Sequence, residues 1–118
     1  MLFATVCYGP IFTKRYSNQV NKVGKENTVY VLTDRPELFP DCITRDYSSF
    51  TGYSYFTYYS KILFLFALLE ETKQRVNYVD ADFLKITFNK ELIVDDTTLF
   101  TSIAVPYNKT LLHRLDYK

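Results

Sequence analysis

Residues 75–82 read Arg-Val-Asn-Tyr-Val-Asp-Ala-Asp, an apolar run that ends in two acidic residues. The β-branched and aromatic residues of this run predict a buried strand. A stretch rich in Leu and Phe precedes it at about residues 56–73 and predicts a core helix packed on a sheet. A helix that leads directly into a short apolar strand is the unit from which parallel sheets are built.

The N-terminal half repeats this alternation. Residues 2–8 predict a buried strand that ends at Gly9-Pro10, and residues 28–33 predict a second strand. Between them an amphipathic helix is expected from Pro10 to Gly24. Its apolar positions are Ile11, Phe12, Tyr16, Val20 and Val23. The order strand, helix, strand, helix, strand predicts a Rossmann-like α/β fold with a mostly parallel sheet and flanking helices. Right-handed crossovers would bring the carboxyl ends of the strands to one edge, where ligands bind.

The remaining segments are expected to be shorter and less regular. The predicted features are a turn at Pro36–Pro40, a short strand at Cys42–Tyr47, a polar-aromatic loop at Ser48–Tyr55, a sheet extension at Phe83–Thr87, a helical turn at Asn89–Val94 and a last strand at Leu99–Val105.

Composition limits the function classes. The 118 residues suit one domain, and 47% apolar residues with 23% charged residues are typical of a globular chain. The net charge is +1 and no basic block occurs, so nothing favours nucleic-acid binding. The longest apolar run, Ile62–Leu69, is too short to span a membrane. Without an export signal, Cys7 and Cys42 are expected to stay reduced, and we expect a cytoplasmic protein of bacterial or viral origin.

Asp80 and Asp82 are the strongest candidates for chemistry. Near-extended backbone would point both side chains the same way, with the small Ala81 leaving room between them. Two like charges this close favour a cation between them, and Mg²⁺ or Mn²⁺ is the natural occupant. An Asp-x-Asp pair is common, however, so two solvated turn aspartates remain an equal alternative on this motif alone.

Three blocks of sequence carry a resemblance to a known family. They are Phe3-Ala4-Thr5 with Tyr8, the segment Tyr30–Pro36, and the helix segment Tyr59–Ile62 followed by Tyr78–Asp82. In this order and at this spacing the chain resembles the nucleotide-binding half of GT-A glycosyltransferases. It is most similar to the retaining family of the blood-group A/B and α-1,3-galactosyl transferases, and its last block also resembles glycogenin-like transferases.

The resemblance implies a UDP-sugar donor, a Mn²⁺ or Mg²⁺ cofactor and a glycan or other acceptor. Phe3, Ala4 and Thr5 would line the base and ribose site, and Tyr8 would flank the uracil unless it only packs at the sheet end. Asp80 would meet the ribose and the metal, Ala81 would lie between the acids, and Asp82 would ligate the metal. Lys61 stands where the family has an Arg, and would contact the donor sugar or Asp80.

Length is the main departure from the family, whose members continue into an acceptor region that carries the catalytic carboxylate. The catalytic residue is therefore unknown, and the chain is a fragment, a minimal version, or one that works as a homo-oligomer or with a partner chain. Two alternatives stay open: a non-catalytic donor-binding module or assembly subunit, and a phosphatase of the haloacid dehalogenase type with Asp80 as nucleophile. Asp34 is interpreted as a turn or cap residue, and His113 as a surface residue.

Overall fold

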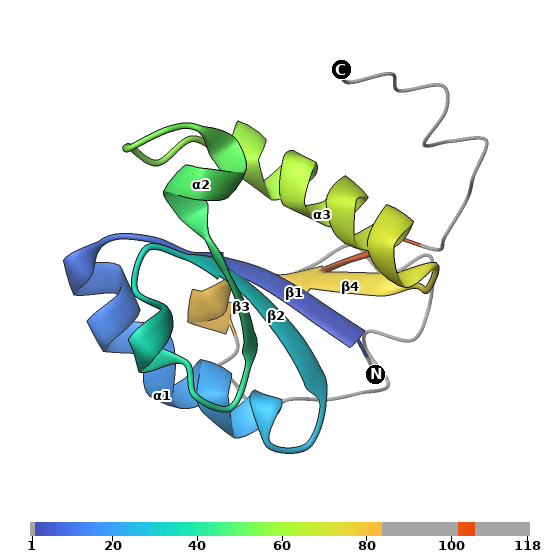
Figure 1. Ribbon diagram of the computed structural model, residues 1–118. Coiled ribbons are helices and arrows are strands. Elements are labelled where there is room, and N and C mark those ends of the chain that lie inside the picture. Colours follow the sequence, from blue (N-terminus) through green and yellow to red (C-terminus); the bar gives the residue numbers. More distant parts are fainter. Residues whose placement is uncertain (1, 84–101, 106–118) are drawn as a thin grey trace.

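The computed structural model describes residues 2–83 and the strand backbone of residues 102–105. Five strands form one sheet in the order β3-β2-β1-β4-β5 (Figure 1). Strands β3, β2, β1 and β4 run parallel, and β5 is antiparallel to β4. The predicted α/β fold with a mostly parallel, Rossmann-like sheet is confirmed. The strands are β1 Leu2–Cys7, β2 Thr28–Thr33, β3 Ile43–Asp46, β4 Val76–Val79 and β5 Ser102–Val105.

Helices cover both faces of this sheet. Figure 1 shows α1 on one face and α3 on the other. The helical segments are α1 Pro10–Gly24, the 3-10 turn η1 Pro36–Leu38, α2 Tyr47–Thr51, α3 Tyr59–Thr72 and the 3-10 turn η2 Ala81–Phe83. The chain passes from β1 through α1 to β2 on one side of β1, then returns through α3 to β4 on the other side. The strand order therefore reverses between β1 and β4, and such sheets bind ligands beyond the strand ends at this reversal.

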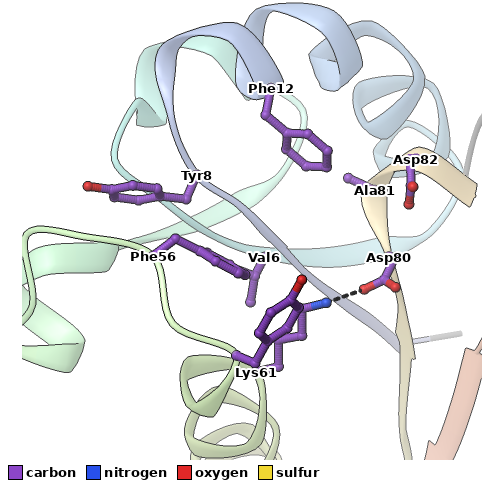
Figure 2. A pocket seen from close by; sticks show the side chains of 9 residues that line it. Val6, Tyr8, Phe12, Phe56, Lys61, Asp80, Ala81 and Asp82 are labelled. Atoms are coloured by element: carbon purple, nitrogen blue, oxygen red, sulfur yellow. Dashed lines mark hydrogen bonds and ion pairs between the residues drawn. The ribbon is translucent and has the colours of Figure 1, made fainter.

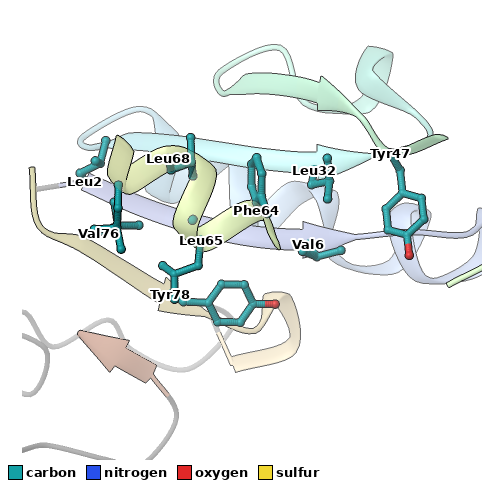
Figure 3. Close-up of a cluster of buried hydrophobic side chains, with 11 residues drawn as sticks. Leu2, Val6, Leu32, Tyr47, Phe64, Leu65, Leu68, Val76 and Tyr78 are labelled. Atoms are coloured by element: carbon teal, nitrogen blue, oxygen red, sulfur yellow. The ribbon is translucent and has the colours of Figure 1, made fainter. Parts of the chain in front are cut away.

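The α3 face of the sheet holds one apolar core (Figure 3). Alternate residues of β1 and β4 point into it, because side chains of a strand alternate between the two faces. Burying each large side chain of α3 in this way contributes about 1.5–3 kcal/mol. The buried members are Leu2, Ala4, Val6, Leu32, Tyr47, Phe64, Leu65, Leu68, Leu69, Val76 and Tyr78.

The α1 face is packed differently from the sequence expectation. Helix α1 buries Thr13, Ser17, Val20 and Val23, whereas Ile11 is 79% exposed, so the assignment of Ile11 to the apolar face was wrong. Thr13 begins the buried stripe, and a position two residues earlier lies about 200° around the helix. The buried face of α1 therefore includes the small polar side chains of Thr13 and Ser17.

Gly24 marks a second close approach, at the end of α1. A Cβ atom at this position would lie 2.6 Å from the carbonyl oxygen of Asp41 and 2.9 Å from Sγ of Cys42. The lack of a side chain thus allows the helix end to contact the loop that precedes β3.

Residues 48–51 differ from the predicted loop because they belong to helix α2, which begins at Tyr47, the last residue of the predicted strand. The side chain of Asp46 caps this helix by accepting a hydrogen bond from the Ser49 amide at 2.9 Å, and Gly52 ends it with φ 77°. Local capping therefore stabilises a short helix in a sequence of weak helix formers. The core helix expected from residue 56 begins at Tyr59.

The C-terminal predictions are only partly covered by the described residues. Phe83 lies in η2, so the expected sheet extension is wrong at its first residue. The rest of that extension, the helical turn at Asn89–Val94 and His113 lie outside the described residues. The last predicted strand is present as β5 over Ser102–Val105. Among the helices in residues 2–83, none combines the length and apolar character needed to cross a membrane.

Candidate functional site

A cavity of about 470 Å³ opens at the carboxyl ends of β1 and β4, where the strand order reverses. This size is within the range of small-molecule sites, about 300–1,000 Å³. The lining combines aromatic side chains with one ammonium and two carboxylate groups (Figure 2). The lining residues are Val6, Tyr8, Phe12, Phe56, Tyr58, Lys61, Asp80, Ala81 and Asp82.

The strand pattern explains why Lys61 and Asp80 meet. In β4, Val76 and Tyr78 face α3, and Asp80 follows two residues later. Lys61 lies in the first turn of α3, and its Nζ donates to Oδ1 of Asp80 at 2.9 Å. The sequence expectation that Lys61 contacts Asp80 is confirmed.

Aromatic rings surround the ammonium group of Lys61. Its Nζ lies 5.1 Å from the ring centroid of Tyr58 and 5.8 Å from that of Tyr78, within the range of cation–π contacts. The Lys61 side chain is 27% exposed, and that of Asp80 is 39% exposed. Burial, reinforced by the charge of Asp80, raises the pKa of Tyr78, so its side chain stays a neutral phenol. The Lys61–Asp80 pair therefore rests on uncharged aromatic surface and remains open to solvent on one side.

The turn after β4 has a different backbone from the one expected. Ala81 and Asp82 belong to the 3-10 turn η2, so the assumption of extended backbone across Asp80–Asp82 was wrong. Gln19 fixes this turn by donating from Nε2 to the carbonyl oxygen of Ala81 at 2.7 Å. Even so, both acids line the same cavity, and Figure 2 shows them on the segment that forms one wall.

Asp80 and Asp82 are the residues of this cavity that could hold a divalent ion together with a bound ligand. Across residues 2–83, no three His, Cys, Asp or Glu side chains gather into a metal-binding group. Mg²⁺, however, is commonly held by one or two carboxylates together with substrate phosphates and water. The hard oxygens of Asp80 and Asp82, beside a cavity large enough for a phosphate ligand, suit this kind of site and not a closed protein cage.

Tyr8 lines the cavity and also packs against neighbouring aromatic rings. Its ring centroid is 4.5 Å from that of Tyr47 and 6.3 Å from that of Phe56. Its hydroxyl donates to the carbonyl oxygen of Ser54, which ties the segment before α3 to the end of β1. The packing interpretation of Tyr8 is thus satisfied, and its stacking on a base remains a prediction.

Phe3, Ala4 and Thr5 do not reach the cavity. Each is 1% exposed within β1, and none lines the cavity wall. Helices cover both faces of this central strand, so only residues near its carboxyl end open onto the crevice. Val6 and Tyr8 are the residues that do so.

Four lining residues were missed by the sequence analysis. Phe56 and Tyr58 come from the segment before α3, Phe12 from the first turn of α1, and Val6 from β1. The available signal was composition, since residues 47–60 contain only Tyr, Phe, Ser, Thr and Gly. Such uncharged, aromatic stretches supply rigid contact surface with hydroxyl groups.

Asp34 and the two cysteines lie outside the cavity lining. Oδ1 of Asp34 accepts a hydrogen bond from the Gly9 amide at 3.0 Å and so fixes the turn before α1, where Gly9 has φ 98°. Asp34 therefore has a structural role, but the turn that its side chain fixes is the one at Gly9. Both thiols are free, and burial raises the pKa of Cys7 to about 12 and that of Cys42 to about 11. They therefore stay protonated at neutral pH.

Comparison with known proteins gives no assignment. No family model, curated protein or solved structure matches this chain.

Proposed function

We propose that this chain is the donor-binding domain of a glycosyltransferase that binds a UDP-sugar together with Mn²⁺ or Mg²⁺ and transfers the hexose. One observation supports the proposal most strongly. Three separate segments of the sequence, which carry Tyr8, Lys61 and the Asp80–Asp82 pair, line one cavity at the strand-order reversal. This is the place where open α/β sheets bind nucleotides.

The charge of the lining supports a requirement for metal. Asp80, Asp82 and Lys61 together carry a formal charge of −1 among the lining residues. A diphosphate alone would meet net repulsion from this wall. A divalent ion reverses the sign of the wall, and when bound it would neutralise the negative charge of a leaving diphosphate.

The remaining lining residues suit the organic part of a nucleotide. Phe56 and Tyr58 are aromatic and lie close together, with ring centroids 5.2 Å apart at an interplanar angle of 79°. Planar bases pack well on such rings. Lys61 can orient a phosphate as a point charge, although it lacks the two-pronged geometry of Arg. The chain's own residues therefore bind and orient the donor.

A thermal-shift titration tests the proposal. UDP should raise the Tm only when Mn²⁺ or Mg²⁺ is present, because the ion and the two carboxylates together bind the diphosphate. At a hundredfold excess over Kd the stabilisation should be about 2.7 kcal/mol. Asp82→Asn should abolish the shift, whereas Glu37→Gln, at an exposed position outside the cavity lining, should retain it. Absence of any shift with UDP plus Mn²⁺ in the unaltered protein would refute the proposal.

A binding module without turnover is the second candidate. Asp80 and Asp82 are the only carboxylates in the cavity lining among the described residues, and the proposal uses both to hold the ion. No further acid of this lining is left to act as nucleophile or base. Measuring UDP-sugar hydrolysis by the chain separates the two candidates. Hydrolysis that Asp82→Ala abolishes favours the transferase, and tight UDP binding without hydrolysis favours the module.

A further inference from the structure

Lys61 already pairs with one carboxylate oxygen of Asp80, a residue that the proposed function also uses to hold the metal ion. The ammonium lies 2.9 Å from Oδ1 of Asp80. A Mg²⁺ ion bound to the same oxygen at about 2.1 Å would lie within about 5 Å of that ammonium. Two positive groups this close repel each other, so full contact of Asp80 with both is unfavourable.

The backbone of Lys61 is held at the start of a helix, whereas its ammonium lies in a side chain that is 27% exposed. Ser60 beside it is fully buried, and its Oγ donates to the carbonyl oxygen of Thr57 at 2.6 Å. This bond fixes the start of α3. The Lys61 ammonium, by contrast, contacts the ring of Tyr58, which is 76% exposed, and lies at the end of a flexible four-carbon chain.

We propose that Lys61 is the built-in counter-ion of Asp80 in the ligand-free protein and passes to the diphosphate when a divalent ion takes Asp80. This inference rests on the proposed function and concerns how the same site is regulated. The ion alone has to displace Lys61 without giving the ammonium a new partner. A diphosphate supplies that partner, so ion and nucleotide bind as a coupled pair.

The binding of Mn²⁺ and the binding of UDP must affect each other equally. If UDP increases the affinity for Mn²⁺ by some factor, Mn²⁺ must increase the affinity for UDP by the same factor. Direct contact between the ion and the phosphates supplies part of this factor, and the transfer of Lys61 supplies the rest. Replacing Lys61 with an uncharged residue should therefore remove only the part of the coupling factor that comes from the transfer of Lys61.

Calorimetric titration of Mn²⁺, with and without saturating UDP, tests the proposal. Lys61→Met should bind Mn²⁺ alone about three- to tenfold more tightly than the unaltered protein, as expected for loss of a partly exposed ion pair and of repulsion near the ion. Its coupling factor should fall by a similar ratio. Lys61→Arg keeps the charge and should keep the coupling. Lys14→Met, at an exposed position on α1, is the matched control and should change neither quantity.

The outcomes separate this inference from the proposed function. If the unaltered protein binds neither Mn²⁺ nor UDP, the proposed function fails. If it binds both, but Lys61→Met binds Mn²⁺ no more tightly or keeps the full coupling factor, the counter-ion role is overturned and the proposed function stands. Should Lys61→Met lose its native circular dichroism, Lys61→Gln takes its place with the same expected results.

Discussion

Replacing Gly24 with Ala tests the close contact between α1 and the loop before β3. In an ordinary helix this change stabilises a protein by about 1 kcal/mol. Here the added Cβ would lie 2.6 Å from the Asp41 carbonyl oxygen and 3.2 Å from its carbonyl carbon. Backbone atoms cannot rotate away, and overpacking of this kind costs about 1–3 kcal/mol. We therefore expect net destabilisation of roughly 1 kcal/mol, which corresponds to a Tm lower by about 4 °C.

Urea unfolding followed by circular dichroism measures this change. Asn18→Ala is the matched control, because Asn18 lies on the exposed side of the same helix. It gains helix propensity without a clash and should be stabilising by up to about 0.7 kcal/mol. If Gly24→Ala stabilises the protein as much as Asn18→Ala does, the described contact with Asp41 is wrong.

Two further predictions concern the aromatic wall and the buried thiol. Tyr58→Ala should weaken UDP binding in the presence of Mn²⁺ by about tenfold, since stacking of a base on an aromatic side chain contributes about 1–3 kcal/mol. Tyr55→Ala is the control, because Tyr55 is 63% exposed and does not line the cavity, and equal effects in a binding titration would contradict the assignment. The pKa of the Cys7 thiol rises from 9.0 to about 12 on folding, so stability is unaffected below pH 9 and falls as the unfolded thiol ionises between pH 9 and pH 12. The loss from this thiol approaches about 1.4 kcal/mol per pH unit, and the Cys42 thiol, whose pKa is raised to about 11, adds a loss above pH 9. Cys7→Ala should therefore make this part of a urea-midpoint profile less steep without flattening it, and an unchanged slope would show that other groups cause it.

The sheet could be predicted because its signals are local. Strands β1, β2 and β4 are short apolar runs bounded by turn residues, and α1 is bounded by Pro10 and Gly24. Helix α2 could not be predicted in this way, because its residues are weak helix formers and its stability comes from the Asp46 cap and packing of Tyr47. The exposure of Ile11 could not be predicted from the sequence either. Which face of α1 packs on the sheet depends on how the helix is placed in the folded protein.

The candidate site was only partly predictable for a similar reason. Asp80 and Asp82 end an apolar strand, so their position at the sheet edge follows from the sequence. Phe56 and Tyr58 reach the cavity through the packing of the segment before α3, which no spacing in the sequence indicates. Thr5 shows the reverse situation, because it belongs to one of the family-like blocks but is buried in the sheet and does not line the cavity.

The Lys61–Asp80 pair is better explained by ligand binding than by folding. Core packing determines its geometry, because Lys61 comes from α3 and Asp80 from the end of β4, and Phe64 and Val76 of these two elements share one core. A partly exposed ion pair contributes only about 0–1 kcal/mol to stability, so breaking it costs little. The same two groups lie in the wall of a cavity. The carboxylate of Asp82 in this wall has no further positive lining group among the described residues to balance its charge. An ion pair that is held in place by its surroundings but is easily exchanged is well suited to be replaced by a metal ion and a phosphate.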